Sequence, residues 1–95
     1  MTRLSRYCRL ERDAIAACAL DGMTLLYHRA SGQTHMVISP VPEILDALDE
    51  TRPASPADIH RHMSQRYELG DAAEAVALIG AHLAELAGLG LVRGL

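Results

Sequence analysis

Several residue types that commonly build protein cores or metal sites are scarce in this chain or missing from it. It contains no tryptophan and no phenylalanine, so an apolar core must be built from aliphatic residues. The 49% hydrophobic content is high enough to argue against a disordered chain. The two cysteines, Cys8 and Cys18, form neither a Cys-x-x-Cys pair nor a cysteine–histidine spacing typical of zinc. We therefore expect two small packing residues in a reducing compartment.

Long apolar runs are absent as well. The arginine-rich start is not followed by the apolar segment of a secretory signal, and Ala14–Leu20 is too short to cross a bilayer. We therefore expect a cytoplasmic protein without a membrane partner. The 95 residues suit a single domain, which we place at 14–95 after a polar lead-in at 1–13. The formal net charge of −3 disfavours nucleic acid as a partner, because phosphate binding usually needs a basic face.

A β-hairpin is predicted in the first half of the chain. Asp21-Gly22 marks a turn before the first strand, Met23–Arg29, and a second turn around Ser31-Gly32 separates it from Thr34–Ile38. The Ala-rich stretch Ile15–Leu20, just before the hairpin, fits either a short strand or a helical turn.

The turn position predicts which hairpin residues face each other. A loop centred on Ser31-Gly32 places His28 opposite His35 and Tyr27 opposite Met36. Because side chains alternate between the two faces of a strand, one face suits the core and the other is wetter. The predicted core face carries Met23, Leu25, Tyr27, Met36 and Ile38, and the wetter face carries Leu26, His28, His35 and Val37.

Three helices are predicted after the hairpin from their caps and breakers. Their expected boundaries are Ser39 to Arg52, Ser55 to Gly70 and Asp71 to Gly88, with Pro40 and Pro56 in the first turns of the first two. Their apolar stripes are Val41, Ile44, Leu45 and Leu48, then Ile59, Met63 and Tyr67, then Val76, Ile79, Leu83 and Leu86. Strands followed by helices predict an α+β domain, with a small N-terminal antiparallel β-sheet packed on a three-helix bundle.

With these motifs in order, the chain resembles the PqqD family of peptide chaperones over Asp21–Val92. The resemblance rests on Ile44-Leu45-Asp46-Ala47-Leu48-Asp49, on Ser55-Pro56-Ala57-Asp58-Ile59 with Arg66-Tyr67, and on Leu83 to Val92. The hairpin from Leu25 to His35 is similar to a subgroup found alongside relatives of HPr kinase. Two positions depart from the family pattern: Ile38-Ser39 stands where members often have Leu-Asn, and Glu50 where they often have Gly.

The resemblance implies a winged-helix-like fold and a role without catalysis. Members of the family recognise the leader of a ribosomally made precursor peptide. The leader adds as a strand to the exposed edge of the N-terminal sheet and rests against the last helix. A partner enzyme, often of the radical type, then modifies the peptide. No cofactor is implied for the chaperone itself.

Two segments of this chain are the corresponding candidates for peptide binding. Leu78 is informative because it lies off the inner stripe of the third helix. The candidate residues are Thr34, His35, Met36, Val37 and Ile38 on the strand, and Ala75, Leu78, Ile79 and His82 on the helix. Strand addition needs a free edge and pockets for alternate side chains, which such a pair of segments supplies. Alternatively, the helix is broadly buried, or Leu78 is an ordinary exposed leucine.

Other functions were weighed against peptide binding. His28 and His35 offer two metal ligands across the hairpin, but zinc needs three or four, so no metal site is expected. No phosphate-binding loop, nucleophile elbow or His-Glu-x-x-His motif is present, so we expect no enzyme. A DNA-binding winged helix, with Arg61 and Arg66 on phosphates, stays an alternative. So does a dimerisation or adaptor module, including a homodimer that pairs through the same strand edge.

Overall fold

The strands form where the turn residues of the sequence allow them. In the computed structural model, which describes residues 5–11 and 13–95, β2 (Ile15–Leu20) and β3 (Met23–His28) are joined at Gly22. Gly22 has φ 70°, a left-handed conformation that suits glycine in a tight turn. The strand β4 (Gln33–Val37) follows Gly32, which has φ 72°. The three strands form one antiparallel sheet in the order β2-β3-β4, so the ambiguous Ala-rich stretch is a strand.

The hairpin of β3 and β4 is confirmed, but its register differs from the expected one by two residues. Leu26 lies opposite His35 rather than Val37, and His28 lies opposite Gln33, so His28 and His35 do not face each other. The four-residue loop begins at Arg29 because the Gly32 amide donates to the His28 carbonyl oxygen at 2.8 Å. A shift of two residues keeps each side chain on its face, so the predicted grouping of residues by face holds.

The predicted core face of the hairpin is wrong. Leu26 is only 3% exposed and joins the core, whereas Met36 is 64% exposed and Tyr27 40% exposed. Leu25 and Met23 are half-buried on this outward side, and Ile38 is 62% exposed. The face that packs on the helices is the one that carries the two histidines and Val37. The more apolar face of the sheet therefore points away from the core.

The helices begin close to their expected boundaries, and the first two end earlier than expected. Helix α1 (Val41–Ala47) begins after Pro40, so the expected N-cap at Ser39 is wrong by one residue. It ends early because the Asp49 carboxylate accepts hydrogen bonds from the Thr51 amide at 2.8 Å and the Arg52 amide at 3.1 Å. Local side-chain bonds of this kind compete with helix formation.

Helix α2 (Pro56–Met63) has the predicted capping box. The Ser55 hydroxyl accepts from the Asp58 amide at 3.2 Å, and the Asp58 carboxylate accepts from the Ser55 amide at 3.0 Å. The helix ends at Met63 rather than near Gly70, and the Ser64 hydroxyl donates to the Arg61 carbonyl at the new end. Tyr67 is consequently 45% exposed and does not belong to the inner stripe.

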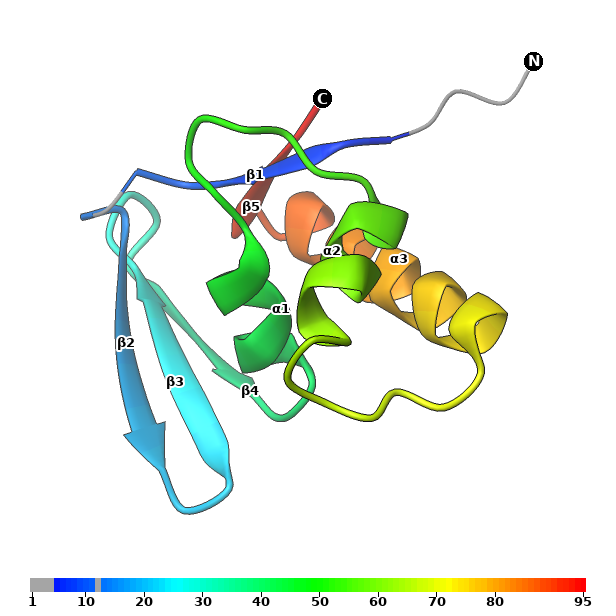
Figure 1. Ribbon diagram of the computed structural model, residues 1–95. Helices are drawn as coiled ribbons and strands as arrows, with labels where there is room; N and C mark the ends of the chain where they lie inside the picture. The colour runs from blue at the N-terminus through cyan, green and yellow to red at the C-terminus, as the bar shows by residue number, and fades with distance from the viewer. Residues whose placement is uncertain (1–4, 12) are drawn as a thin grey trace.

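Helix α3 (Ala72–Gly88) begins at the predicted cap, where the Asp71 carboxylate accepts from the Glu74 amide at 2.9 Å. Its stripe of Ile79, Leu83 and Leu86 is buried, and Val76 is half-buried. Figure 1 shows the three helices on one side of the sheet β2-β3-β4, with the β2–β3 turn projecting away from them.

A second, two-stranded sheet joins the two ends of the described chain. The expected lead-in contains β1 (Tyr7–Arg9), which pairs antiparallel with β5 (Val92–Gly94), so folded structure starts before residue 14. Tyr7 and Cys8 are buried there, whereas Cys18 is exposed on β2. The prediction that the cysteines are packing residues is therefore confirmed for Cys8 and wrong for Cys18. Residues 1–4 and 12 of the lead-in lie outside the described part. The core comprises Tyr7, Leu26, Val41, Ile44, Leu45, Leu48, Ile59, Met63, Ile79, Leu83, Leu86, Leu91 and Val92.

Candidate functional site: the free edge of β4 and a flank of α3

Strand β4 has one neighbour and one free edge. It pairs with β3, and no other strand within residues 5–11 and 13–95 lies on its far side. In an antiparallel sheet, alternate residues of an edge strand direct their N–H and C=O groups away from the sheet. These groups form a template on which another extended chain can pair.

The edge carries none of the features that usually block such pairing. The strands β2, β3 and β4 contain no Asp, Glu, Lys, Arg or Pro between their bounds. Natural edge strands are commonly protected by a charged side chain, a proline or a bulge. The strand β2 forms the opposite edge, which Figure 1 places on the side of the sheet far from the helices. Of the two edges, β4 is therefore the one that lies beside the helices.

The candidate residues of this edge divide between the two faces of the sheet. Thr34 and Met36 point outward with the exposed Ile38, and His35 and Val37 point toward the helices. Val37 packs against the core cluster to which Ile79 belongs. Each of the two predicted site segments thus has one residue in the core or packed against it.

His35 is the polar side chain of interest on the inner side of the edge. Its Nε2 atom is buried and has no hydrogen-bond partner. In contrast, the Nδ1 atom of His28 lies 2.8 Å from the Ser31 hydroxyl, which holds that ring at the turn. A buried polar atom without a partner carries an unrecovered cost of desolvation. A polar group of a bound chain that reached Nε2 would remove that cost.

The flank of α3 that carries Leu78 is open. Successive residues of a helix are separated by about 100°, so Leu78 and Gly80 lie on opposite sides of the buried Ile79. The Gly80 side is occupied, since a Cβ atom there would lie 3.4 Å from Pro56 Cγ of α2. Leu78 itself is 53% exposed. Its neighbours on this flank, Ala75 and His82, are half-buried.

The exposure of these side chains excludes one alternative for α3, the broadly buried helix, and Leu78 as an ordinary exposed leucine stays the other alternative. Ile79 is 4% exposed, so this candidate supports the site from beneath and does not line its surface. The helix is not buried all round, because Leu78 keeps about half of its surface in solvent. The exposed leucine, the half-buried pair beside it and the free strand edge are the parts that a peptide groove requires.

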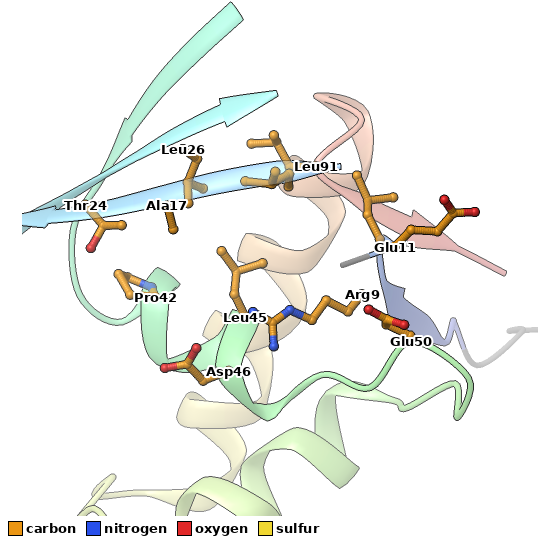
Figure 2. Close-up of a pocket in the computed structure, with 12 residues that line it drawn as sticks. Arg9, Glu11, Ala17, Thr24, Leu26, Pro42, Leu45, Asp46, Glu50 and Leu91 are labelled. Carbon is orange, nitrogen blue, oxygen red and sulfur yellow. The ribbon is translucent and has the colours of Figure 1, made fainter. Parts of the chain in front are cut away.

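A separate pocket of about 590 Å³ lies between the inner face of the sheet and α1. Its walls are partly apolar and partly charged. Figure 2 shows Leu26, Leu45 and Leu91 around it, with Arg9 extending across the opening toward α1. Glu11, Asp46 and Glu50 also line it. None of the predicted site residues belongs to this pocket. The sequence pattern did not predict this pocket, because Arg9 of β1 and the residues after it line the pocket and were assigned to a polar lead-in.

The charged residues form local pairs on the surface. Arg61 contacts the Asp58 carboxylate, and Arg6 lies 3.6 Å from it. Hydrogen bonds from the Ser55 amide and hydroxyl, with the two arginines, hold the pKa of Asp58 below its usual value. The Thr51 and Arg52 amides lower the pKa of Asp49 in the same way. Arg61, one of the two arginines considered for phosphate binding, is thus already paired, and Arg66 lies beyond the end of α2.

Metal ligands and membrane-spanning features were also sought in the described part of the chain. No group of three or more His, Cys, Asp or Glu side chains is arranged there to hold a metal ion. The helices of residues 5–11 and 13–95 include none that is both long and apolar enough to span a bilayer.

Comparison with known proteins identifies two solved structures with this fold. A scan against protein-family models and a search of curated proteins both give no match. The structure of TbiB1 in complex with the TbiA(beta) leader peptide aligns with a TM-score of 0.67 and 20% identity, covering 90% of this chain and 94% of that one. A lasso peptide synthetase B1 complexed with the leader peptide aligns with a TM-score of 0.60 and 22% identity, covering 95% and 98%. This chain therefore shares the fold of two proteins whose structures contain bound leader peptides.

Proposed function

We propose that this chain is a PqqD-like peptide-binding chaperone without catalytic activity of its own. It holds the leader of a ribosomally made precursor peptide as an added strand on β4 and presents the peptide to a modifying enzyme. The observation that carries the proposal is the free, uncharged edge of β4. The open flank of α3 at Leu78 is the second surface that the family resemblance assigns to the peptide. Backbone pairing supplies affinity in strand addition, and pockets for alternate side chains supply specificity.

The comparisons support this proposal at the level of the whole fold. Both similar proteins were solved with a leader peptide, and each is matched over nearly all of its length. The alignments therefore include almost the whole of both leader-bound chains and not just one part of them. A binding module of this size fits a role in which another protein performs the chemistry.

Two finer features of the proposal come from the family resemblance. We infer that the partner is a peptide-modifying enzyme in the cytoplasm, with a radical enzyme as the type that the resemblance implies. The subgroup associated with relatives of HPr kinase stays a prediction from the hairpin sequence. Neither of the two similar structures is described in those terms.

The two alternative functions have less support. A DNA-binding role would need a basic surface, but the net charge is −3 and Arg61 is paired with Asp58. A homodimer through β4 would use the same backbone groups as the leader. Pairing of two copies at this edge would therefore compete with peptide binding.

An NMR titration tests the proposal directly. Isotope-labelled protein is titrated with the leader peptide encoded beside it and, separately, with a mixed-sequence DNA duplex. We expect the peptide to shift the amide signals of residues 34–38 and 75–82 and the DNA to shift none. A peptide that leaves both segments unchanged contradicts the site, and shifts caused by DNA alone around Arg61 and Arg66 favour the regulator.

A further inference from the structure

The sheet has a second exposed surface besides its edge. We define the outer sheet face as the side of β2, β3 and β4 that points away from the helices. The strand pairings place its members in three rows across the sheet. They are Ala16, Cys18 and Leu20 on β2, Met23, Leu25 and Tyr27 on β3, and Thr34, Met36 and the adjoining Ile38 on β4.

This face is apolar and exposed at the same time. Leu20 is 50% exposed, Met36 is 64% exposed and Ile38 is 62% exposed, and Cys18 is exposed beside them. No member of the face carries a charge. The largest contiguous apolar patch on a soluble monomer typically measures about 300–600 Å² and is often a binding site. The outer sheet face therefore has the composition of an interface.

The size of the face indicates what kind of partner fits it. Three strands about 4.8 Å apart and about 20 Å long give a footprint on the order of 300 Å². A stable assembly buries about 800 Å² on each partner. A second copy stacked on this face offers only the same small area. A larger protein can cover the face and gain further contacts beyond it.

The outer sheet face is also continuous with the proposed leader site. Thr34 and Met36 belong to both, because they lie on β4 and point outward. A leader strand added to β4 extends the sheet by one strand, and every second side chain of the leader points to the outer side. The face thus becomes larger when a leader is bound, and its new part is supplied by the precursor itself.

We propose that the outer sheet face, extended by the bound leader strand, is the surface on which the modifying enzyme docks. This inference rests on the proposed function. The partner presents a complementary surface of aliphatic and aromatic residues without charges. Since the enzyme contacts chaperone and leader together, it binds the loaded chaperone more tightly than the empty one. By linkage, it strengthens leader binding by the same factor.

The test uses the full-length chain with the precursor and the modifying enzyme encoded beside it, each purified separately. Leu20→Asp places a charge on the face at β2, two strands away from the leader edge. Leu89→Asp is the matched control, because Leu89 is 47% exposed and lies at the end of α3, outside the sheet. Leu20→Gln is an uncharged second variant in case the aspartate affects folding. Leader affinity is measured by fluorescence polarisation and modification by mass spectrometry.

We expect Leu20→Asp to lower the chaperone-dependent rate of modification by about tenfold, because docking would bury the aspartate charge against an apolar surface without a partner. Leader affinity should stay within about twofold of the wild type, because strand pairing on β4 is intact. Leu89→Asp should change neither quantity. Unchanged modification by both Leu20 variants overturns the docking surface while leaving the leader site intact. Equal losses of leader affinity and modification overturn it too, since the face would then belong to the leader site.

A sedimentation experiment tests whether a second copy of this chain, and not the enzyme, covers the outer sheet face. We expect the leader-free chain to sediment as a monomer at about 100 μM, because a face of this size is too small for a stable dimer. A dimer that Leu20→Asp dissociates would overturn the proposal in favour of a second copy. Failure of the leader to bind the wild type would contradict the proposed function instead, and the two failures are therefore distinguishable.

Discussion

Replacing Leu78 tests the peptide groove more sharply than any other single substitution. The side chain is 53% exposed in the free protein, so about half of its apolar surface is available to a ligand. Complete burial of a leucine is worth about 1.5–3 kcal/mol, and half of that is about 1 kcal/mol. Leu78→Ala should therefore raise the dissociation constant of the leader about fivefold. Leu78→Arg should raise it further, because a guanidinium group would enter the groove.

The stability of these variants should hardly change. Leu and Arg have similar helix propensities, and substitutions at exposed sites usually change the free energy of unfolding by less than about 0.5 kcal/mol. For a domain of this size, that corresponds to a shift in Tm of at most about 4 °C. The matched control is Leu89→Arg, at a leucine that is 47% exposed at the other end of the same helix. It should alter neither stability nor affinity.

The assay is a fluorescence polarisation titration of a labelled leader, with Tm from circular dichroism. A fall in Tm of about 10 °C for Leu78→Arg would show that Leu78 supports the core, because losses of that size arise from buried side chains. An unchanged dissociation constant for both Leu78 variants, with Tm preserved, would refute the placement of the groove on this flank of α3.

Three further predictions concern the stability of the scaffold. Leu83→Ala, at a residue that is 0% exposed, should lower the free energy of unfolding by about 2–5 kcal/mol in urea denaturation, and a loss below about 1 kcal/mol would contradict its central place in the core. Ser55→Ala removes the α2 cap and should lower the free energy of unfolding by about 1 kcal/mol in the same assay, and an unchanged free energy would show that the capping box does not stabilise the fold. Asp49 and Asp58 have lowered pKa values, so they stabilise the folded chain above the unfolded pKa of about 3.9 and lose this effect as the pH falls through their folded values. Thermal denaturation should show a drop in Tm below about pH 4 that is smaller in Asp58→Asn, and an equal drop would contradict the assignment.

The parts of the fold that follow local rules could be predicted from the sequence. The capping box at Ser55, the cap at Asp71 and the buried stripe of α3 depend on residues three or four positions apart, which the sequence displays directly. The hairpin of β3 and β4 and the turns at Gly22 and Gly32 follow from local turn chemistry in the same way, whereas the Ala-rich stretch that forms β2 is ambiguous from the sequence alone.

Other parts depend on contacts that local patterns do not contain. The pairing of Tyr7 with Gly94 joins the two ends of the chain, and nothing in the arginine-rich start indicates it. The early end of α1 depends on Asp49 turning its carboxylate back to two amides, a choice that a helical pattern leaves open. Both features are set by tertiary context or by competing local bonds.

The inverted hairpin is the most instructive difference. The sequence favours Met36, Tyr27 and Ile38 for the core because they are more apolar than the histidines on the other face. The fold instead buries Leu26 and leaves the more apolar side in solvent. An apolar pattern predicts burial within the chain only when no partner covers that surface. Where a partner supplies the second half of an interface, the same pattern predicts binding.

The pairing of β1 with β5 also bears on how this domain can be joined to others. Because Tyr7–Arg9 pairs antiparallel with Val92–Gly94, the chain enters β1 close to the point where it leaves β5 (Figure 1). An N-terminal and a C-terminal fusion should therefore give a tethered enzyme nearly the same reach to a peptide held on β4.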